Sequence, residues 1–143
     1  MPDYCSNFFV PFVLLRGDFE TDGASLLRRR GSYTASPADA QGYPQLAGAG
    51  TYRFSVTLTA AEAAQTAAVS LDSLDACELF VNGVSAGVRL WAPFRFDTDG
   101  LFREGENTVD VRMTLPMHNL FCAPEDRIAV GLTAAPRLER RVP

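Results

Sequence analysis

The chain has 143 residues, 47% of them hydrophobic, and its formal net charge is −4. These values fit one globular domain and argue against intrinsic disorder. A domain of this size buries roughly two thirds of its unfolded surface, so it needs neither a metal nor a disulfide to fold. All 13 basic residues are arginines, but the net acidity gives no electrostatic basis for binding nucleic acid.

No apolar stretch reaches the roughly 20 residues that span a membrane. The start, MPDYCSNFFVPFVLL, has no basic region and is followed by no small-residue cleavage site, so no signal peptide is expected. Localisation is left undetermined. The cysteines Cys5, Cys77 and Cys122 form no CxxC pair, which disfavours a disulfide framework or a zinc site. Three reduced thiols are the simpler interpretation, and one disulfide with one free thiol is the alternative.

The first strand signal is the run FFVPFVLL at residues 8–15. Pro11 predicts an edge strand or a bend there, because proline has no N–H for a ladder. Residues 17–31 are expected to form a polar connection. The alternation over residues 51–58 predicts a strand with one core-facing side. The residues on that side are Tyr52, Phe54, Val56 and Leu58.

The alanine-rich residues 60–67 are compatible with a short helix that leads into a strand at about 67–72. The pair Asn82-Gly83 supplies the positive φ angles of a type I′ turn, which predicts a hairpin between strands 77–81 and 84–90. Gly87 is expected to allow a bulge in the return strand.

Further strands are predicted at residues 94–96, 108–115 and 127–133, the last with Ile128, Val130 and Leu132 facing inward. A helical turn capped by Thr98 or Asp97 is expected at 98–102. Gly105-Glu106-Asn107 is interpreted as a second tight turn in which Gly105 and Asn107 adopt the left-handed conformation. The tail, residues 137–143, is expected to fray.

About eight short strands separated by turn signals, with almost no helix, predict an all-β sandwich or barrel. The sequence contains no internal repeat and no change of composition that would mark a boundary. Residues 1–143 are therefore interpreted as a single domain.

Four stretches together resemble the galactose-binding-like jelly-roll domain of glycoside hydrolases. They are Ala47–Tyr52, Glu78–Gly87, Pro93–Asp97 and, after Leu101, Gly105–Val109. That domain occurs as the sugar-binding-like domain of family 2 β-glycosidases and as a C-terminal module of rhamnosidase-like hydrolases. The resemblance covers residues 43–121 and implies a jelly-roll β-sandwich of about eight antiparallel strands. It departs at Met113, where rhamnosidase-like members often carry asparagine.

The resemblance implies a non-catalytic, carbohydrate-binding-like accessory module of a glycoside hydrolase. Its partners would be a glycan ligand and the catalytic domain of a parent hydrolase. The alternative is a purely structural domain between other domains, without sugar binding, and a stand-alone enzyme is the third hypothesis. Fold-level analogy cannot choose among them, because sandwiches of this type host many functions.

Trp91, the only tryptophan, is the candidate carbohydrate-binding residue. An exposed indole stacks on a sugar ring, and Arg89 and Arg95 would bond the sugar hydroxyls. In the alternative interpretation the indole closes the end of the sandwich or packs against a neighbouring domain.

Asp18, Glu20 and Asp22 are candidate ligands of a structural calcium ion, which modules of the resembling type sometimes carry. An EF-hand is excluded, because Arg29 stands at the twelfth position where a bidentate glutamate is required. No other cofactor is expected.

His118 is the only histidine, and no GxSxG elbow accompanies it, so a catalytic triad is not expected. His118 with Cys122 would make at most a two-ligand metal site, and a loop histidine without a chemical role is preferred. The pairs Asp97 with Asp99 and Glu104 with Glu106 offer carboxylates to a glycosidase mechanism, but all four occupy expected turns. Cys77 is predicted to be a buried, inert thiol.

Overall fold

The structure is a computed structural model that describes residues 19–22, 25–28, 35–38, 41–43 and 45–141. Its contacts divide the chain into two units, Met1–Gly31 and Ser32–Pro143. The expectation of a single domain stays a prediction. The strand predicted at residues 8–15 lies outside the described residues.

In the first unit, β1 (Phe19–Asp22) pairs antiparallel with β2 (Ser25–Arg28). Residues 17–31 were predicted as a polar connection without strands, and the two paired strands correct that prediction. Asp22-Gly23 is a turn-forming pair in sequence, and Asp22 stands opposite Ser25 in the ladder. The polar composition of residues 17–31 favours a connection, whereas the Asp22-Gly23 pair favours a hairpin turn.

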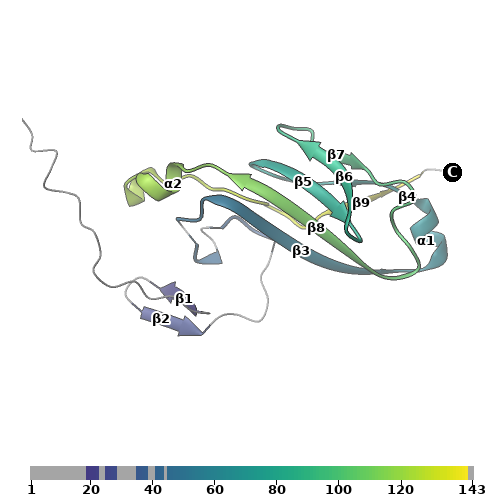
Figure 1. Ribbon diagram of the computed structural model, residues 1–143, viewed down its shortest axis with the longest axis horizontal. Coiled ribbons are helices and arrows are strands. Elements are labelled where there is room, and N and C mark those ends of the chain that lie inside the picture. The colour runs from purple at the N-terminus through teal and green to yellow at the C-terminus, as the bar shows by residue number, and fades with distance from the viewer. Residues whose placement is uncertain (1–18, 23–24, 29–34, 39–40, 44, 142–143) are drawn as a thin grey trace, which may run out of the picture. The chain divides into compact units, whose positions relative to one another are not determined.

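The second unit is an all-β sandwich, as the sequence predicted (Figure 1). One sheet has the strand order β3-β8-β5-β6 and the other β7-β4-β9, and all neighbouring strands are antiparallel. The first sheet comprises β3 (Gly48–Leu58), β5 (Ala76–Val81), β6 (Val84–Arg89) and β8 (Gly105–Leu115). The second comprises β4 (Thr66–Ser70), β7 (Arg95–Asp97) and β9 (Arg137–Arg140). The jelly-roll assignment stays a prediction.

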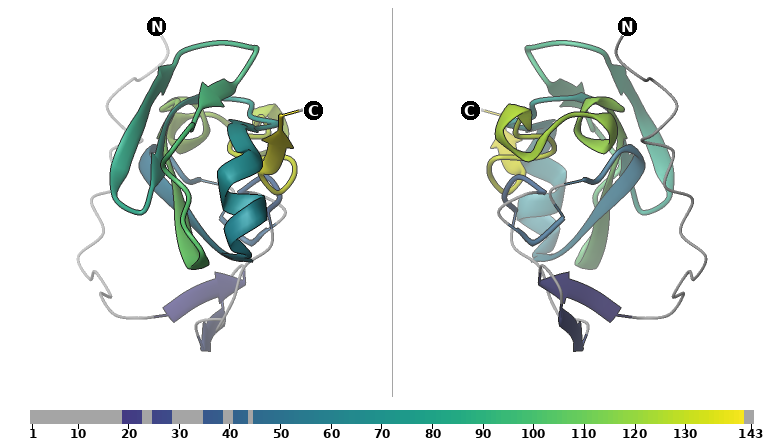
Figure 2. Two further views of the ribbon diagram at one scale, coloured as in Figure 1. Left: turned by 90° about the vertical axis from the view of Figure 1, so that its right-hand side faces the viewer. Right: turned by 90° about the vertical axis from the view of Figure 1, so that its left-hand side faces the viewer.

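Short helical segments lie at opposite ends of this sandwich (Figure 2). They are α1 (Ala60–Gln65), α2 (His118–Phe121) and the 3₁₀ turn η2 (Pro124–Asp126). Helix α1 begins with a capping box: the Thr59 hydroxyl accepts the N–H of Glu62, and the Glu62 carboxylate accepts the N–H of Thr59. No helix among the described residues is both long and apolar enough to cross a membrane.

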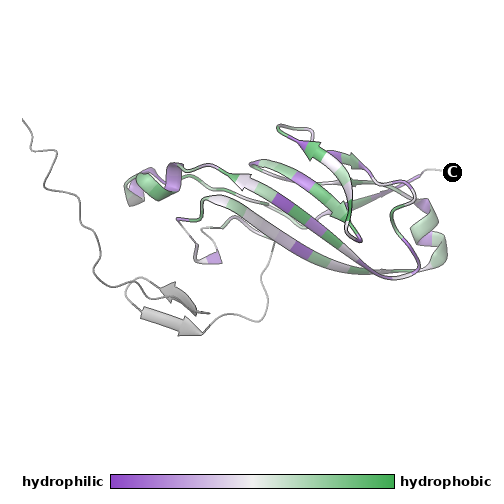
Figure 3. Ribbon diagram, viewed as in Figure 1, coloured by the Kyte–Doolittle hydropathy of each residue, from purple (hydrophilic) through white to green (hydrophobic). Residues whose placement is uncertain are grey.

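The core lies between the sheets and follows from strict alternation along the strands. In β8 every second residue is buried, and hydrophilic and hydrophobic positions alternate along the ribbon (Figure 3). The four predicted core residues of β3 pack on this core, with Leu58 buried and the others half-buried. Val69 of β4 and Phe96 of β7 close it from the opposite sheet, both with no exposed surface.

The predicted hairpin between β5 and β6 is confirmed. Asn82 has a φ of 51° and Gly83 a φ of 82°, the two positive angles that a type I′ turn requires. The register shifts between Leu79 and Phe80, opposite Gly87, whose φ is 110°. The expected bulge therefore occurs, and glycine suits it because side-chain-bearing residues rarely adopt this angle.

The prediction for Asn107 was wrong. β8 begins at Gly105, so Asn107 is a strand residue with no exposed surface, in line with the buried Val109. Only Gly105 has the positive φ that was expected of both. Glycine at 105 completes the turn, and the side chain of Asn107 is held by internal hydrogen bonds instead of a left-handed backbone.

Asn107 and Asn82 form a fully bonded polar pair. Asn107 Oδ1 accepts from Asn82 Nδ2 at 2.8 Å and from Arg103 N at 2.9 Å, and its Nδ2 donates to the carbonyls of Arg103 and Gly105. Asn82 Nδ2 also donates to the Leu101 carbonyl, and Asn82 Oδ1 accepts from Thr108 N. Asn107 is buried and Asn82 is half-buried, and amides that are fully bonded in this way favour one arrangement of the loops they join.

The strand predicted at residues 127–133 does not form. The segment makes one isolated bridge, Leu132 to Ser73, and Ile128 is 48% exposed, although Val130 and Leu132 are buried. Side chains hold the segment through separate hydrogen bonds. Asn119 Nδ2 donates to the Ile128 carbonyl, Asn119 Oδ1 accepts from Ile128 N, and the Asp75 carboxylate accepts from Gly131 N. The alternating apolar pattern thus predicted the burial of Val130 and Leu132 correctly, but the strand that it also predicted does not form.

The tail does not fray through residue 140. β9 pairs with β4, and Leu138 packs on the core. Three ion pairs fasten it: Arg137 with Asp72, Glu139 with Arg95, and Arg140 with Glu62. The partners in these pairs are 44 to 78 residues apart along the chain, so no local sequence pattern predicted them.

Replacing Asn107 by alanine is expected to lower the free energy of unfolding by about 3 kcal/mol, because four hydrogen bonds of a fully buried amide are lost. Urea denaturation measures the change. Glu106→Ala, at the exposed neighbouring position, is the control and should cost no more than about 0.5 kcal/mol. Equal losses in the two variants would contradict the role assigned to Asn107.

Gly131→Ala is expected to cost about 3 kcal/mol or more, because φ is +101° and the added Cβ would meet the Tyr52 hydroxyl and ring. Gly100→Ala is the matched control: φ is +75°, but nothing lies within 4 Å of the added Cβ. It should show the backbone strain alone, about 1–2 kcal/mol. Denaturation midpoints that fall equally would show that the Tyr52 contact is unimportant.

Candidate functional site

Trp91 lies in the connection between β6 and β7 and is 73% exposed. The preceding Leu90 is 63% exposed, and the peptide bond from Ala92 to Pro93 is cis. An indole buried in the sandwich end could not stack on a ligand, and the observed exposure is compatible with such stacking. The assignment of Trp91 as a sugar platform stays a prediction.

The guanidinium of Arg89 forms hydrogen bonds with backbone carbonyls of this protein. Its Nε donates to the Arg95 carbonyl at 3.1 Å and its Nη1 to the Val88 carbonyl at 2.9 Å. The guanidinium carbon lies 5.2 Å from the centroid of the buried Phe96 ring, a cation–π geometry. These contacts place the guanidinium over one edge of the core and use two of its five N–H donors.

Arg95 is paired with an acid of the last strand. Its Nε donates to Glu139 Oε2 at 2.7 Å, and the Ser70 hydroxyl bonds the other carboxylate oxygen. These two hydrogen bonds, the one from Ser70 first, lower the pKa of Glu139 from its ordinary value. The structure thus brings Arg89 and Arg95 together through a backbone carbonyl, but it describes no contact of either guanidinium with the indole of Trp91.

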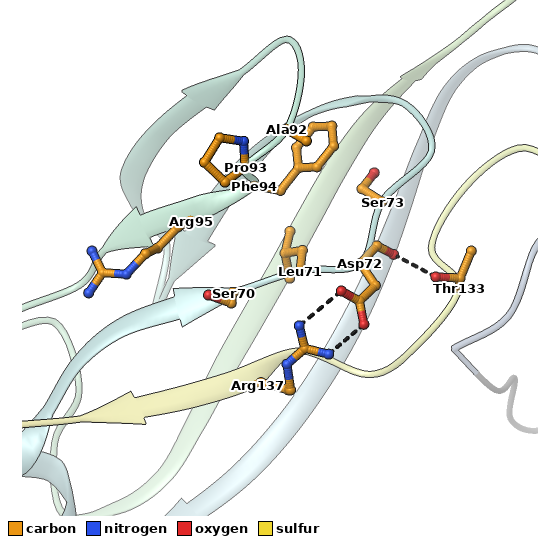
Figure 4. Close-up of a pocket in the computed structure, with 10 residues that line it drawn as sticks. All are labelled: Ser70, Leu71, Asp72, Ser73, Ala92, Pro93, Phe94, Arg95, Thr133 and Arg137. Carbon is orange, nitrogen blue, oxygen red and sulfur yellow. Dashed lines mark hydrogen bonds and ion pairs between the residues drawn. The ribbon is translucent and has the colours of Figure 1, made fainter.

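A pocket of about 410 Å³ opens at the end of β4, beside the Trp91 connection (Figure 4). We call it the β4 pocket; its lining residues are Ser70, Leu71, Asp72, Ser73, Ala92, Pro93, Phe94, Arg95, Thr133 and Arg137. Arg95 is the one predicted site residue among them. Sequence reasoning missed the rest because three segments far apart in the chain supply them.

An ion pair forms one wall of the β4 pocket. Arg137 bonds both carboxylate oxygens of Asp72 through Nη1 and Nη2, as the dashed lines show (Figure 4). The guanidinium lowers the pKa of Asp72 from its ordinary value, and the carboxylate raises the pKa of Arg137. The pair is partly exposed, so its contribution to stability is screened by water.

The candidate calcium ligands are not brought together by anything the structure describes. Asp18 lies outside the described residues, and Glu20 and Asp22 lie in β1, for which the backbone alone is described. Within the described ranges no group of three acidic, histidine or cysteine residues could hold a metal ion. The calcium site stays a prediction.

The remaining chemical candidates have structural contacts. His118 Nε2 lies 2.9 Å from the Asp126 carbonyl, and the His118 carbonyl accepts Cys122 N. Asp97 accepts the N–H of Asp99, which in turn pairs with Arg141. The turn at residues 98–101 is closed by one bond from Leu101 N to the Thr98 carbonyl.

Cys77 is 3% exposed, as predicted for a buried thiol. Burial raises the pKa of this thiol to about 11, so it stays protonated near neutral pH. A protonated, inaccessible thiol is a poor nucleophile, which agrees with the inert role expected for Cys77 from the sequence.

Large apolar side chains are exposed on β6 and the residues that follow it. The β6 edge patch consists of Val84, Val88, Leu90 and Trp91, each more than half exposed. A second set of exposed apolar residues lies in and next to α2 and consists of Met117, Leu120, Phe121 and Ile128. Val84 stands opposite the buried Val81 and Val88 opposite Glu78, so these two side chains lie on different faces of the sheet, along its free edge.

No protein-family model and no curated protein matches the chain. Among solved structures, a rhamnosidase from Novosphingobium sp. PP1Y matches 73% of this chain with a TM-score of 0.53 and 24% identity. A β-glucuronidase from Bifidobacterium dentium matches 56% of it with a TM-score of 0.50 and 22% identity. The chain spans only 10% and 14% of these proteins, so the likeness is to the fold of a small part of each.

Proposed function

We propose that this chain is a non-catalytic accessory domain of a glycoside hydrolase, which contacts a neighbouring catalytic domain through its β6 edge patch. The fold is supported by its likeness to small parts of a rhamnosidase and a β-glucuronidase. A domain of this size within a larger enzyme would bury part of its surface where it packs against a neighbouring domain. The β6 edge patch is the observation that carries the proposal.

A catalytic role is disfavoured by the placement of the carboxylates. Glycoside hydrolysis needs two carboxyl groups on opposite sides of the scissile bond, roughly 5 to 9.5 Å apart. The β4 pocket is lined by a single carboxylate, Asp72, and Arg137 binds both of its oxygens. Of the acids that the sequence offered, Asp97 and Asp99 are engaged in a turn and an ion pair.

The β6 edge patch has the character of a protein contact. β6 is the last strand of its sheet, and the bulge at Gly87 interrupts the regular edge that another strand would need for pairing. A partner would therefore bind mainly to side chains. Three of the four residues are aliphatic and offer no donor or acceptor to a glycan, whereas a large apolar contact suits a domain interface.

The test compares amide hydrogen exchange in this 143-residue chain with exchange in the whole polypeptide encoded by the open reading frame that contains it. Docking predicts that amides of residues 84–91 exchange more slowly in the longer protein, while those of α1 exchange at the same rate in both. A Leu90→Ser and Trp91→Ser double variant should restore fast exchange. Equal exchange in the two proteins, or a reading frame without a catalytic domain, would contradict the proposal.

Weak glycan binding by Trp91 is a second candidate, favoured by the 73% exposure of that side chain. Arg95 would assist, since only its Nε is committed to Glu139. Affinity electrophoresis in gels that contain a panel of polysaccharides tests it. Retardation that Trp91→Ala abolishes and Leu90→Ala leaves intact is the expected result, because only the indole offers a flat stacking face. No retardation on any glycan would exclude this candidate.

A further inference from the structure

We propose that β9 and the residue that follows it form a clasp held by charge, which opens as a unit while the rest of the sandwich stays folded. We call residues 137–141 the β9 clasp. Salt and acid open it by weakening its ion pairs. Opening uncovers one edge of β4 and removes the Arg137 wall of the β4 pocket. The inference does not depend on the domain contact proposed above, because the β6 edge patch belongs to the other sheet.

The buried core is complete without the β9 clasp. Among the residues that the structure describes, every buried residue of the hydrophobic core precedes β9, and the last of them is Leu132. Within β9, Arg137 and Arg140 are exposed, and Leu138 is the one apolar residue and is half-buried. Departure of β9 therefore exposes little apolar surface, and segments with few buried apolar contacts open at the lowest free energy.

Every charged side chain of the β9 clasp is matched by an opposite charge. The pairs are Arg137 with Asp72, Glu139 with Arg95, Arg140 with Glu62 and Arg141 with Asp99. Helix α1, the residues that follow β4, β7 and the residues that follow β7 supply these partners, and β4 itself carries no charged side chain. The clasp brings three positive charges and one negative charge, and its partners bring three negative charges and one positive charge.

The backbone ladder of β9 is short and irregular. β9 pairs with β4 at four positions, and the register shifts between Thr66 and Ala68. Beyond that shift, Arg141 N donates to the Gln65 carbonyl at 2.9 Å. β4 is also paired with β7 on its other side, where Thr98 N donates to the Ala67 carbonyl. β4 therefore keeps one partner strand when β9 leaves.

Salt reaches the ion pairs because they lie at the surface. The arginine side chain of each pair is at least half exposed. Exposed ion pairs weaken as ionic strength rises, since the Debye length falls from about 10 Å at 0.1 M to about 3 Å at 1 M. Four pairs in five consecutive residues weaken together, so the effect of salt is concentrated on the β9 clasp.

Acid acts in the same direction through the carboxylates. The hydrogen bond from Arg137 lowers the pKa of Asp72, and the hydrogen bonds from Ser70 and Arg95 lower the pKa of Glu139. An acid whose pKa is lower in the folded state stabilises that state while it is ionised. This contribution is present at neutral pH and is lost as the pH falls through the lowered pKa values.

Amide hydrogen exchange of the ¹⁵N-labelled full chain tests the inference by NMR. Between about 0.02 M and about 1 M NaCl, protection of residues 137–141 should fall about tenfold, whereas Val111 in β8 and Thr98 should keep theirs. On stepwise acidification, residues 137–141 should lose their folded resonance positions before Val111 does. Protection of the clasp that is unchanged by salt, or loss of the clasp and Val111 at one pH, would overturn the inference.

Variants separate charge from apolar packing. The triple variant Arg137→Gln, Arg140→Gln and Arg141→Gln should speed exchange of the clasp about tenfold at low salt and remove most of its salt dependence. Arg53→Gln is the matched control: it breaks an exposed pair with Asp110 on the larger sheet and should leave the clasp unaltered.

Leu138→Ala should speed exchange of the clasp but retain its salt dependence, because it removes packing and no charge. Three results from the variants would overturn the inference. The first is slow exchange of the clasp in the triple variant, and the second is exchange of Val111 in that variant as fast as the clasp. The third is a Leu138→Ala protein whose clasp no longer responds to salt.

Discussion

The hydrogen bond between the side chains of Asn82 and Asn107 is the contact on which the larger sheet depends. It joins the tip of the β5–β6 hairpin to the first residues of β8, the strand that lies between β3 and β5 in the sheet. Each amide uses both its oxygen and its nitrogen, so the pair tolerates no shift of one element against the other.

The smaller sheet depends on ion pairs from its last strand. β9 contributes one half-buried apolar residue, Leu138, and three charged residues that reach Asp72, Arg95 and Glu62. Individually such surface pairs stabilise a protein little, but here they are combined with a backbone ladder to β4. They also build one wall of the β4 pocket, so the strand that completes the sheet completes the candidate ligand site.

The two candidate surfaces follow from different sheets and have different chemistry. The β6 edge patch is aliphatic and aromatic and lies on the edge of the four-stranded sheet, where it suits a protein neighbour. The β4 pocket lies at the end of the three-stranded sheet and combines charged and hydroxyl-bearing side chains with apolar ones. Trp91 and Pro93 are two residues apart, yet only Pro93 lines the pocket, so one short connection serves both surfaces.

Local sequence determined the elements whose cause is local. Alternation placed Tyr52, Phe54, Val56 and Leu58 on the core, and Asn82-Gly83 specified its turn, because side-chain direction and φ preference act within a few residues. Tertiary structure alone decided the rest. Asn107 became a core residue, residues 127–133 stayed outside the sheets and β9 joined β4, because their partners lie far away in the chain. The pairing of Arg95 with Glu139 and the assembly of the β4 pocket have the same origin, because each depends on distant segments that meet only in the folded protein.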